Sequence, residues 1–250
     1  MLDAKASLTE LSATDHRLPL YARLRDIFMR RIAAGEWRPS TPLPSESTLA
    51  QVYDVSVGTM RKALAELVEE GLLERRHGSG TFVRRARLER SLLHAFHGGA
   101  CAREARPVIR LISREVVAAA AGDQAALALA RDERVIAIER MHLIGDRPVL
   151  AETVVLPFAP FTELMARDLR DLEHELYPLY ETACGRLVAK VAEKLTVAAA
   201  NGATAHALAC RRGAPVVIIE RRAFGHDGQP LEWRRCRGHA EHFSYRLEAR

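Results

Sequence analysis

Residues 43–83 limit what this 250-residue chain can fold into more than any other part of it. Ser45 follows a proline and precedes an apolar-periodic run, which is the pattern of a helix N-cap, so we expect a helix through Val52. Ser56 then caps a second expected helix, and Gly71 is placed to end it. Its apolar residues recur at three- and four-residue steps and predict one buried stripe: Val57, Met60, Leu64, Leu67 and Val68.

A basic hairpin is expected directly after these helices. Residues 72–76 and 81–83 are β-prone, and the segment 77–80 between them contains two glycines, which suits a hairpin tip. Arg75 and His77 give this hairpin a basic surface. The order of helix, tight turn, helix and two-stranded wing predicts a winged helix-turn-helix domain.

This arrangement favours DNA binding. A helix that buries one face and shows Gly58, Thr59, Arg61 and Lys62 at its N-terminal end can enter a major groove, and its first backbone amides favour phosphate. The alternative is a small helical subdomain with an ordinary solvated charged face. Each arginine taken alone fits that alternative, but the ordered set of cap, helix, turn, helix and basic hairpin does not.

The same residues closely resemble the winged-helix domain of GntR-family transcription regulators across residues 17–84. The segments that carry the resemblance are Leu43-Pro44-Ser45-Glu46, Val55-Ser56, Thr59-Met60-Arg61-Lys62, Glu70-Gly71-Leu72 and Gly78-Ser79-Gly80-Thr81-Phe82-Val83. The resemblance implies a homodimer that binds double-stranded operator DNA. It implies DNA contacts by Thr59, Arg61, His77 and Gly78. The two helix starts and the basic hairpin add Ser45, Ser56, Gly58, Lys62 and Arg75 as expected contacts.

Two departures from the family pattern concern base preference. The family usually has a basic residue where this chain has Ser47, and an arginine where it has Val57. Two expected DNA-contacting arginines are therefore absent, which bears on the family's usual base preference and not on DNA binding itself.

Composition and charge agree with a nucleic-acid partner. The net charge is +5, and residues 17–87 hold 13 Lys or Arg against 8 Asp or Glu, so the excess lies where phosphate contact is expected. The N-terminus has no apolar signal core and no apolar run reaches the length of a membrane span, which predicts a cytoplasmic protein. The four cysteines form no C-x-x-C pair and are expected to be free thiols.

The rest of the chain divides into four expected parts. Residues 1–16 lack periodicity and are interpreted as a mobile arm, and a helix is expected over residues 19–34. The winged domain occupies 17–84, a charged linker 85–91, and a second domain 92–250. Strands are expected in the second domain at 107–117, 134–144, 148–156, 187–197, 216–224, 231–237 and 242–247, with helices at 123–130, 161–166, 171–184 and 201–209. Hairpins with interspersed helices predict an α+β domain on a mainly antiparallel sheet.

This order resembles the UTRA effector domain of HutC-type members of the GntR family, whose fold is similar to chorismate lyase. The resemblance rests on Glu139-Arg140-Met141-His142, Asp146-Arg147-Pro148, Ala151-Glu152-Thr153 and Asp227-Gly228-Gln229-Pro230-Leu231-Glu232. It implies effector contacts by Arg140, His142, Glu152, Glu232 and Arg237. One arginine suits a small organic acid better than a sugar phosphate, because a guanidinium binds a carboxylate in a bidentate manner. The alternative is that these residues form cross-strand ion pairs on a solvated sheet face.

Other functions find less support in the sequence. His94, His97 and Cys101, and likewise His239 and His242, have ligand types but no fourth metal ligand at a recognisable spacing. No nucleophile elbow, P-loop or Rossmann glycine pattern occurs, so we expect no cofactor and no catalytic residue. An organic-acid enzyme of chorismate-lyase-like fold and a plain architectural DNA binder remain as rivals. The N-terminal winged domain argues against the first, and the large second domain argues against the second.

Overall fold

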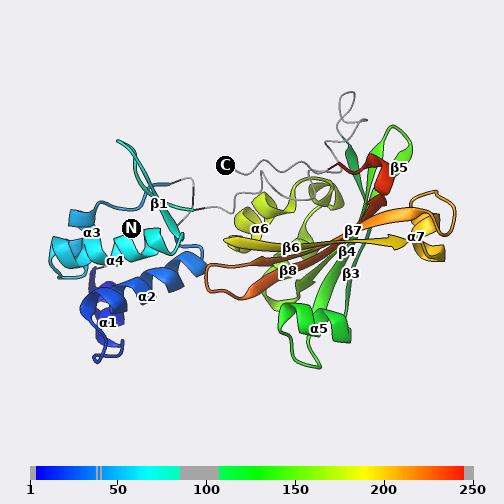
Figure 1. Cartoon of the computed structure of the whole chain (residues 1–250). Coiled ribbons are helices and arrows are strands. Elements are labelled where there is room, and N and C mark those ends of the chain that lie inside the picture. The colour runs from blue at the N-terminus through cyan, green and yellow to red at the C-terminus, as the bar shows by residue number, and fades with distance from the viewer. Residues whose placement is uncertain (1–3, 38, 40, 85–106, 245–250) are drawn as a thin grey trace. The chain divides into compact units, whose positions relative to one another are not determined.

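The structure is a computed structural model that describes residues 4–37, 39, 41–84 and 107–244 (Figure 1). The chain divides into two compact units, one formed mainly by residues 4–84 and the other mainly by residues 107–244. The expected linker, residues 85–91, lies outside the described residues.

The first unit contains helices followed by a two-stranded sheet. Its elements are α1 (Ala4–Ser12), α2 (Leu20–Ala33), α3 (Glu46–Val52), α4 (Val57–Glu69), β1 (Leu73–Arg76) and β2 (Gly80–Val83). Strands β1 and β2 pair antiparallel and form the expected wing. Gly71 has a φ of 75°, a left-handed conformation that favours glycine, and it follows α4 as the sequence predicted.

One apolar core joins α2, α3, α4 and the wing. Phe28 of α2 is fully buried, and its ring lies 5.4 Å from the ring of Tyr53 at the end of α3. Met60, Leu64 and Leu67 supply the α4 stripe, as predicted. Val57 was assigned to that stripe wrongly: its side chain is 41% exposed, because it begins the helix before the first turn that packs on the core.

The mobile arm expected at residues 1–16 is also wrong over most of its length, because Ala4–Ser12 forms a helix. Leu11 is buried, and Arg31 of α2 forms an ion pair with Glu10 at 2.7 Å. Arg23 Nη2 donates to the carbonyl oxygen of Leu11 at 2.6 Å. These contacts with α2 hold a segment whose own sequence has little helical periodicity.

The second unit is built on a six-stranded antiparallel sheet with the order β3-β4-β5-β8-β7-β6. The strands are β3 (Val108–Ala118), β4 (Arg134–Ile144), β5 (Arg147–Pro157), β6 (Lys190–Ala199), β7 (Pro215–Phe224) and β8 (Pro230–His239). Each half of the sheet is a three-stranded meander, and the pairing of β5 with β8 joins the halves. This confirms the α+β class with an antiparallel sheet.

Helices cover parts of both faces of this sheet. α5 (Ala121–Leu127) packs on the face that carries Trp233 and Val155. η2 (Ala159–Ala166), η3 (Leu169–Glu173) and α6 (Leu176–Cys184) supply buried residues such as Phe161 and Tyr180. α7 (Gly202–Ala207) follows β6 and precedes β7, and η4 (Ala240–His242) follows β8.

Two expected elements differ from the structure. The helix expected over residues 171–184 is broken at His174, whose backbone is extended and whose carbonyl oxygen accepts a hydrogen bond from Arg140 Nη1 at 2.7 Å. The strand expected over 242–247 is absent where the structure describes it, since His242 ends a 3-10 turn and residues 243–244 are irregular. Residues 245–247 lie outside the described residues.

Candidate functional site

Two helix starts in the first unit carry the hydroxyl residues that the sequence singled out. The Ser56 hydroxyl accepts from the Thr59 backbone N–H at 3.1 Å, and the hydroxyls of Ser56 and Thr59 lie 2.8 Å apart. Ser45 caps α3 in the same way, accepting from the Thr48 N–H at 3.1 Å. Gly58 and Thr59 are not buried at the start of α4. The first amides of a helix have no partner within the helix, so an accessible helix start such as this one can attract phosphate.

The charged part of this surface is organised by Glu46, which the sequence analysis did not assign to the site. Arg61 Nε on α4 donates to Glu46 Oε2 at 2.8 Å, and Arg75 Nη2 on the wing donates to Glu46 Oε1 at 3.1 Å. The arginine side chains are 64% and 50% exposed. One carboxylate at the start of α3 thus holds a cation from α4 and a cation from the wing.

The remaining predicted DNA contacts have different surroundings. Lys62 Nζ lies 3.7 Å from the centroid of the Tyr21 ring on α2, a cation–π contact. His77 and Gly78 are exposed at the wing tip, where Gly78 has a φ of 68°. Lys62 is therefore placed toward α2, whereas Arg61 and Arg75 share one carboxylate.

In the second unit, four of the five predicted effector residues gather on one face of the sheet. Arg140, His142, Glu152 and Glu232 are all at least 95% buried, so the solvated sheet face considered from the sequence is not what forms. Arg140 Nε donates to Glu152 Oε2 at 2.7 Å, and His142 Nε2 lies 3.1 Å from the same oxygen. Arg140 Nη1 also donates to the carbonyl oxygens of Leu172 and His174.

Arg234, which the sequence analysis missed, connects the two carboxylates. Its Nη1 donates to Glu152 Oε1 at 2.8 Å, and its Nε and Nη2 donate to the two oxygens of Glu232 at 2.8 and 2.7 Å. Tyr180 donates to Glu232 Oε2 at 2.7 Å. Glu232 and Arg234 are two residues apart on β8, so their side chains lie on the same face of the sheet. This spacing of two residues is the sequence pattern that could have revealed Arg234.

Arg237 does not join this cluster. It is an odd number of residues from both Glu232 and Arg234, so strand alternation places it on the opposite face. There it pairs in register with Ala151 and Ile218. Partial burial and the neighbouring Arg235 lower the pKa of Arg237.

Burial and ion pairing act against each other in the cluster. Burial alone would raise the pKa of Glu152, but Arg234 and Arg140, together with His142, hold it well below its usual range. Burial and the nearby Glu232 raise the pKa of Tyr180. The cluster therefore holds an ionised Glu152 between two arginines, with the protonated hydroxyl of Tyr180 beside Glu232.

Within the described residues, no helix is long and apolar enough to span a membrane, and no three His, Cys, Asp or Glu side chains are grouped to hold a metal ion. His94, His97 and Cys101 lie outside the described residues.

Solved structures show the same fold. The ligand-binding domain of a GntR-family transcriptional regulator from Bordetella bronchiseptica superposes with a TM-score of 0.53 at 26% identity, covering 59% of this chain and 92% of that chain. PhnF from Mycobacterium smegmatis gives a TM-score of 0.54 at 21% identity over 90% of this chain and 99% of its own.

Sequence relatives extend over most of the chain. The transcriptional repressor NagR of Bacillus subtilis is 30% identical over 86% of this chain and 88% of its own length. The histidine utilization repressor of Pseudomonas aeruginosa is 31% identical over 82% of each protein. The family of bacterial regulatory proteins called gntR matches residues 20–83, and the UTRA domain family matches residues 102–244. The chain therefore belongs to the GntR family, as a DNA-binding, ligand-responsive transcription regulator with a C-terminal UTRA domain, and is not an enzyme.

Proposed function

We propose that this protein is a homodimeric repressor that leaves its operator when a small organic acid binds the second unit. The observation that carries the proposal is the buried cluster of Arg140, Glu152, Glu232 and Arg234, together with the exposed arginines of the winged unit. Several relatives that align over most of this chain are named repressors, which supports the sign of regulation. We place its action in the cytoplasm, where the DNA of bacteria lies.

For DNA, we propose that Thr59, Arg61 and Lys62 enter or border the major groove while Arg75, His77 and Gly78 follow the backbone. Ser45 and Ser56 position the two helix starts, and Gly58 lets the backbone approach. A cation that is largely exposed and held by one carboxylate can exchange that partner for a phosphate or a base edge at modest cost. Arg61 and Arg75 meet this condition.

For the effector, we propose that an organic acid enters beside His142 and Arg234 and exchanges with Glu152 as the partner of an arginine. Arg140 donates to two backbone carbonyls as well as to Glu152, so it would keep the site in shape. The hydrogen bonds of Arg234 go to the carboxylates of Glu152 and Glu232, which a ligand carboxylate can replace, so Arg234 would meet the ligand. Each exchanged bond changes contacts with η3 and α6, which flank the cluster. A ligand that favours one arrangement of these segments shifts the population of the DNA-competent state.

The test is a mobility-shift titration with an operator fragment and candidate organic acids, on the wild type and on Arg234→Gln. We expect the wild type to lose operator affinity about 5- to 150-fold with the correct acid, the usual range of coupling, and the variant to bind DNA without responding. Arg131→Gln, at an exposed site away from the cluster, is the matched control. A full response in Arg234→Gln excludes the cluster as the effector site. Unchanged near-ultraviolet circular dichroism shows that the variant is folded.

The homodimer is supported by the two edge strands of the sheet, β3 and β6, neither of which pairs with a further strand among the described residues. Strand β3 exposes Val108 and Ile112, and strand β6 exposes Val197, with 67%, 56% and 65% of their surfaces accessible. Exposed apolar side chains on an unpaired edge strand favour pairing with another chain. A second copy would cover such an edge and bring two winged units to one operator.

A further inference from the structure

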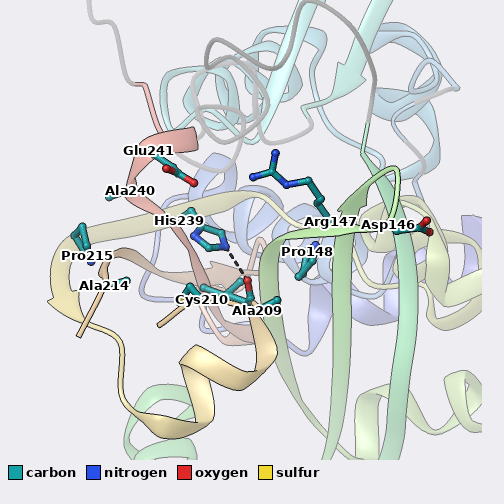
Figure 2. Close-up of a pocket in the computed structure, with 11 residues that line it drawn as sticks. Asp146, Arg147, Pro148, Ala209, Cys210, Ala214, Pro215, His239, Ala240 and Glu241 are labelled. Atoms are coloured by element: carbon teal, nitrogen blue, oxygen red, sulfur yellow. Dashed lines mark hydrogen bonds between the residues drawn. The ribbon is translucent and has the colours of Figure 1, made fainter. Parts of the chain in front are cut away.

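A second site is suggested by a cavity of about 510 Å³ at one end of the sheet of the second unit (Figure 2). It lies between the β4–β5 turn, the end of α7, the start of β7 and the end of β8. The cavity has the size of small-molecule sites. Its apolar lining is formed by Pro148, Leu208, Ala209, Ala214, Pro215 and Ala240, with the half-buried Cys210 beside them.

The wall of the cavity formed by α7 has a fixed shape. Asn201 caps the helix by accepting from the Thr204 N–H at 2.8 Å. Ala209 then adopts a left-handed conformation with a φ of 51°, which costs a residue with a side chain some free energy. His239 Nε2 lies 2.8 Å from the carbonyl oxygen of Leu208, and a carbonyl can only accept, so Nε2 donates. This bond from β8 secures the end of α7 beside the cavity.

Opposite charges flank the opening. Figure 2 shows the guanidinium of Arg147, at the start of β5, and the carboxylate of Glu241, in η4, projecting toward each other, while Asp146 points away. The two make no ion pair with each other, and within the described residues the side chain of Arg147 makes no hydrogen bond or ion pair. Glu241 lies 3.4 Å from His242, which leaves its second oxygen available. A cation and an anion are thus held apart above an apolar lining.

We propose that this cavity binds a free α-amino acid with an apolar side chain. The ligand carboxylate meets Arg147 in a bidentate manner, its ammonium meets Glu241, and its side chain lies against Pro148 and Leu208. A molecule with a single charge leaves one of the two protein charges without a partner. The site is separate from the proposed effector cluster, because strand alternation places His239 on the face of β8 opposite Glu232 and Arg234.

Cys210 serves as the reporter, since its thiol lines the cavity and alkylation by iodoacetamide can be followed by mass spectrometry. Cys101 and Cys184 are replaced by alanine, and Cys236 is buried. We expect L-leucine at millimolar concentration to slow alkylation of Cys210. We expect 4-methylpentanoate and 3-methylbutylamine, which each carry one of its charges, to protect at least about tenfold less effectively, the effect of losing one charged hydrogen-bonding group.

Arg147→Gln and Glu241→Gln should each weaken protection by leucine at least about tenfold, while Arg131→Gln leaves it unchanged. All three should bind operator DNA as the wild type does, which separates this site from the proposed repressor function. Isothermal titration calorimetry with leucine ranks the wild type and the three variants by affinity, independently of Cys210 alkylation. No binding of leucine by either measurement overturns the proposal. Equal binding by the wild type and both glutamine variants overturns it as well.

Discussion

Arg61 is the residue whose loss should most directly weaken operator binding. Its guanidinium is exposed on α4 and shares the Glu46 carboxylate with Arg75 of the wing. We expect Arg61→Ala to cost about 1–3 kcal/mol, the usual value of one good base contact. A mobility-shift titration at fixed salt measures it, with Arg131→Ala in the second unit as the control. Equal affinities of the wild type and Arg61→Ala would remove this residue from the interface.

Glu46 should affect specificity more than affinity. Replacing it by glutamine removes a negative charge beside the two proposed DNA-contacting arginines, and also frees Arg61 and Arg75 from a shared ionic partner. We therefore expect Glu46→Gln to bind random DNA at least as tightly as the wild type, and to lose about tenfold in the ratio of operator to random affinity. Competition titrations with random DNA measure this ratio. If affinity for both DNAs falls equally, Glu46 acts through folding instead.

For single residues, the sequence predicted the helix caps well, but it predicted poorly which distant side chains bond to each other. Ser45, Ser56 and Gly71 were predicted correctly because capping depends on neighbours within a few residues. The bond between Glu46 and Arg75 depends on the wing folding back to α3, which no local pattern encodes. Arg237 was grouped with Glu232 although an odd spacing along a strand separates their faces.

Among the elements, the seam between β5 and β8 carries the charge cluster and should make the second unit sensitive to acid. The folded pKa of Glu152 lies below its unfolded value, so its contribution to stability is complete above the usual glutamate pKa and disappears as pH falls through the folded pKa. We expect unfolding of this unit, followed by Trp233 fluorescence, to become easier across that acid range. Glu152→Gln should be less stable at neutral pH and should lose most of this dependence. An unchanged pH profile in the variant would contradict the assignment.

The elements also show where prediction from sequence stops. Six of the seven strands expected in the second unit, with the hairpins β4–β5 and β7–β8, followed from alternation and turn residues and form in the structure, whereas the strand expected over 242–247 does not form in its described part. That β8 lies between β5 and β7 could not be predicted, because the pairing joins residues about eighty positions apart with no local signature. The helix Ala4–Ser12 was missed for a similar reason, since its contacts are with α2.

For the whole molecule, we predict a symmetric dimer whose operator is an inverted repeat. A single winged unit offers few contacts, and two-fold proteins favour palindromic sites. Light scattering at micromolar concentration should give twice the mass of the 27.8 kDa chain, and footprinting should protect two half-sites. Two variants show which edge strand forms the dimer: the double variant Val108→Lys, Ile112→Lys on β3, and Val197→Lys on β6. The substitution on the strand that pairs should reduce the measured mass to that of the monomer. A monomer that protects one half-site would contradict the prediction.

The division of the sheet into two meanders has a consequence for folding kinetics. Within each meander neighbouring strands are close in sequence, so their loops close early at small entropic cost, whereas β5 and β8 meet only after a long loop closes. Glu152 and Arg234 face each other across that last junction and must give up their water together. Pulsed hydrogen exchange during refolding should therefore protect the amides of β4 and β7 before those shared by β5 and β8, with the charged seam as the slow step.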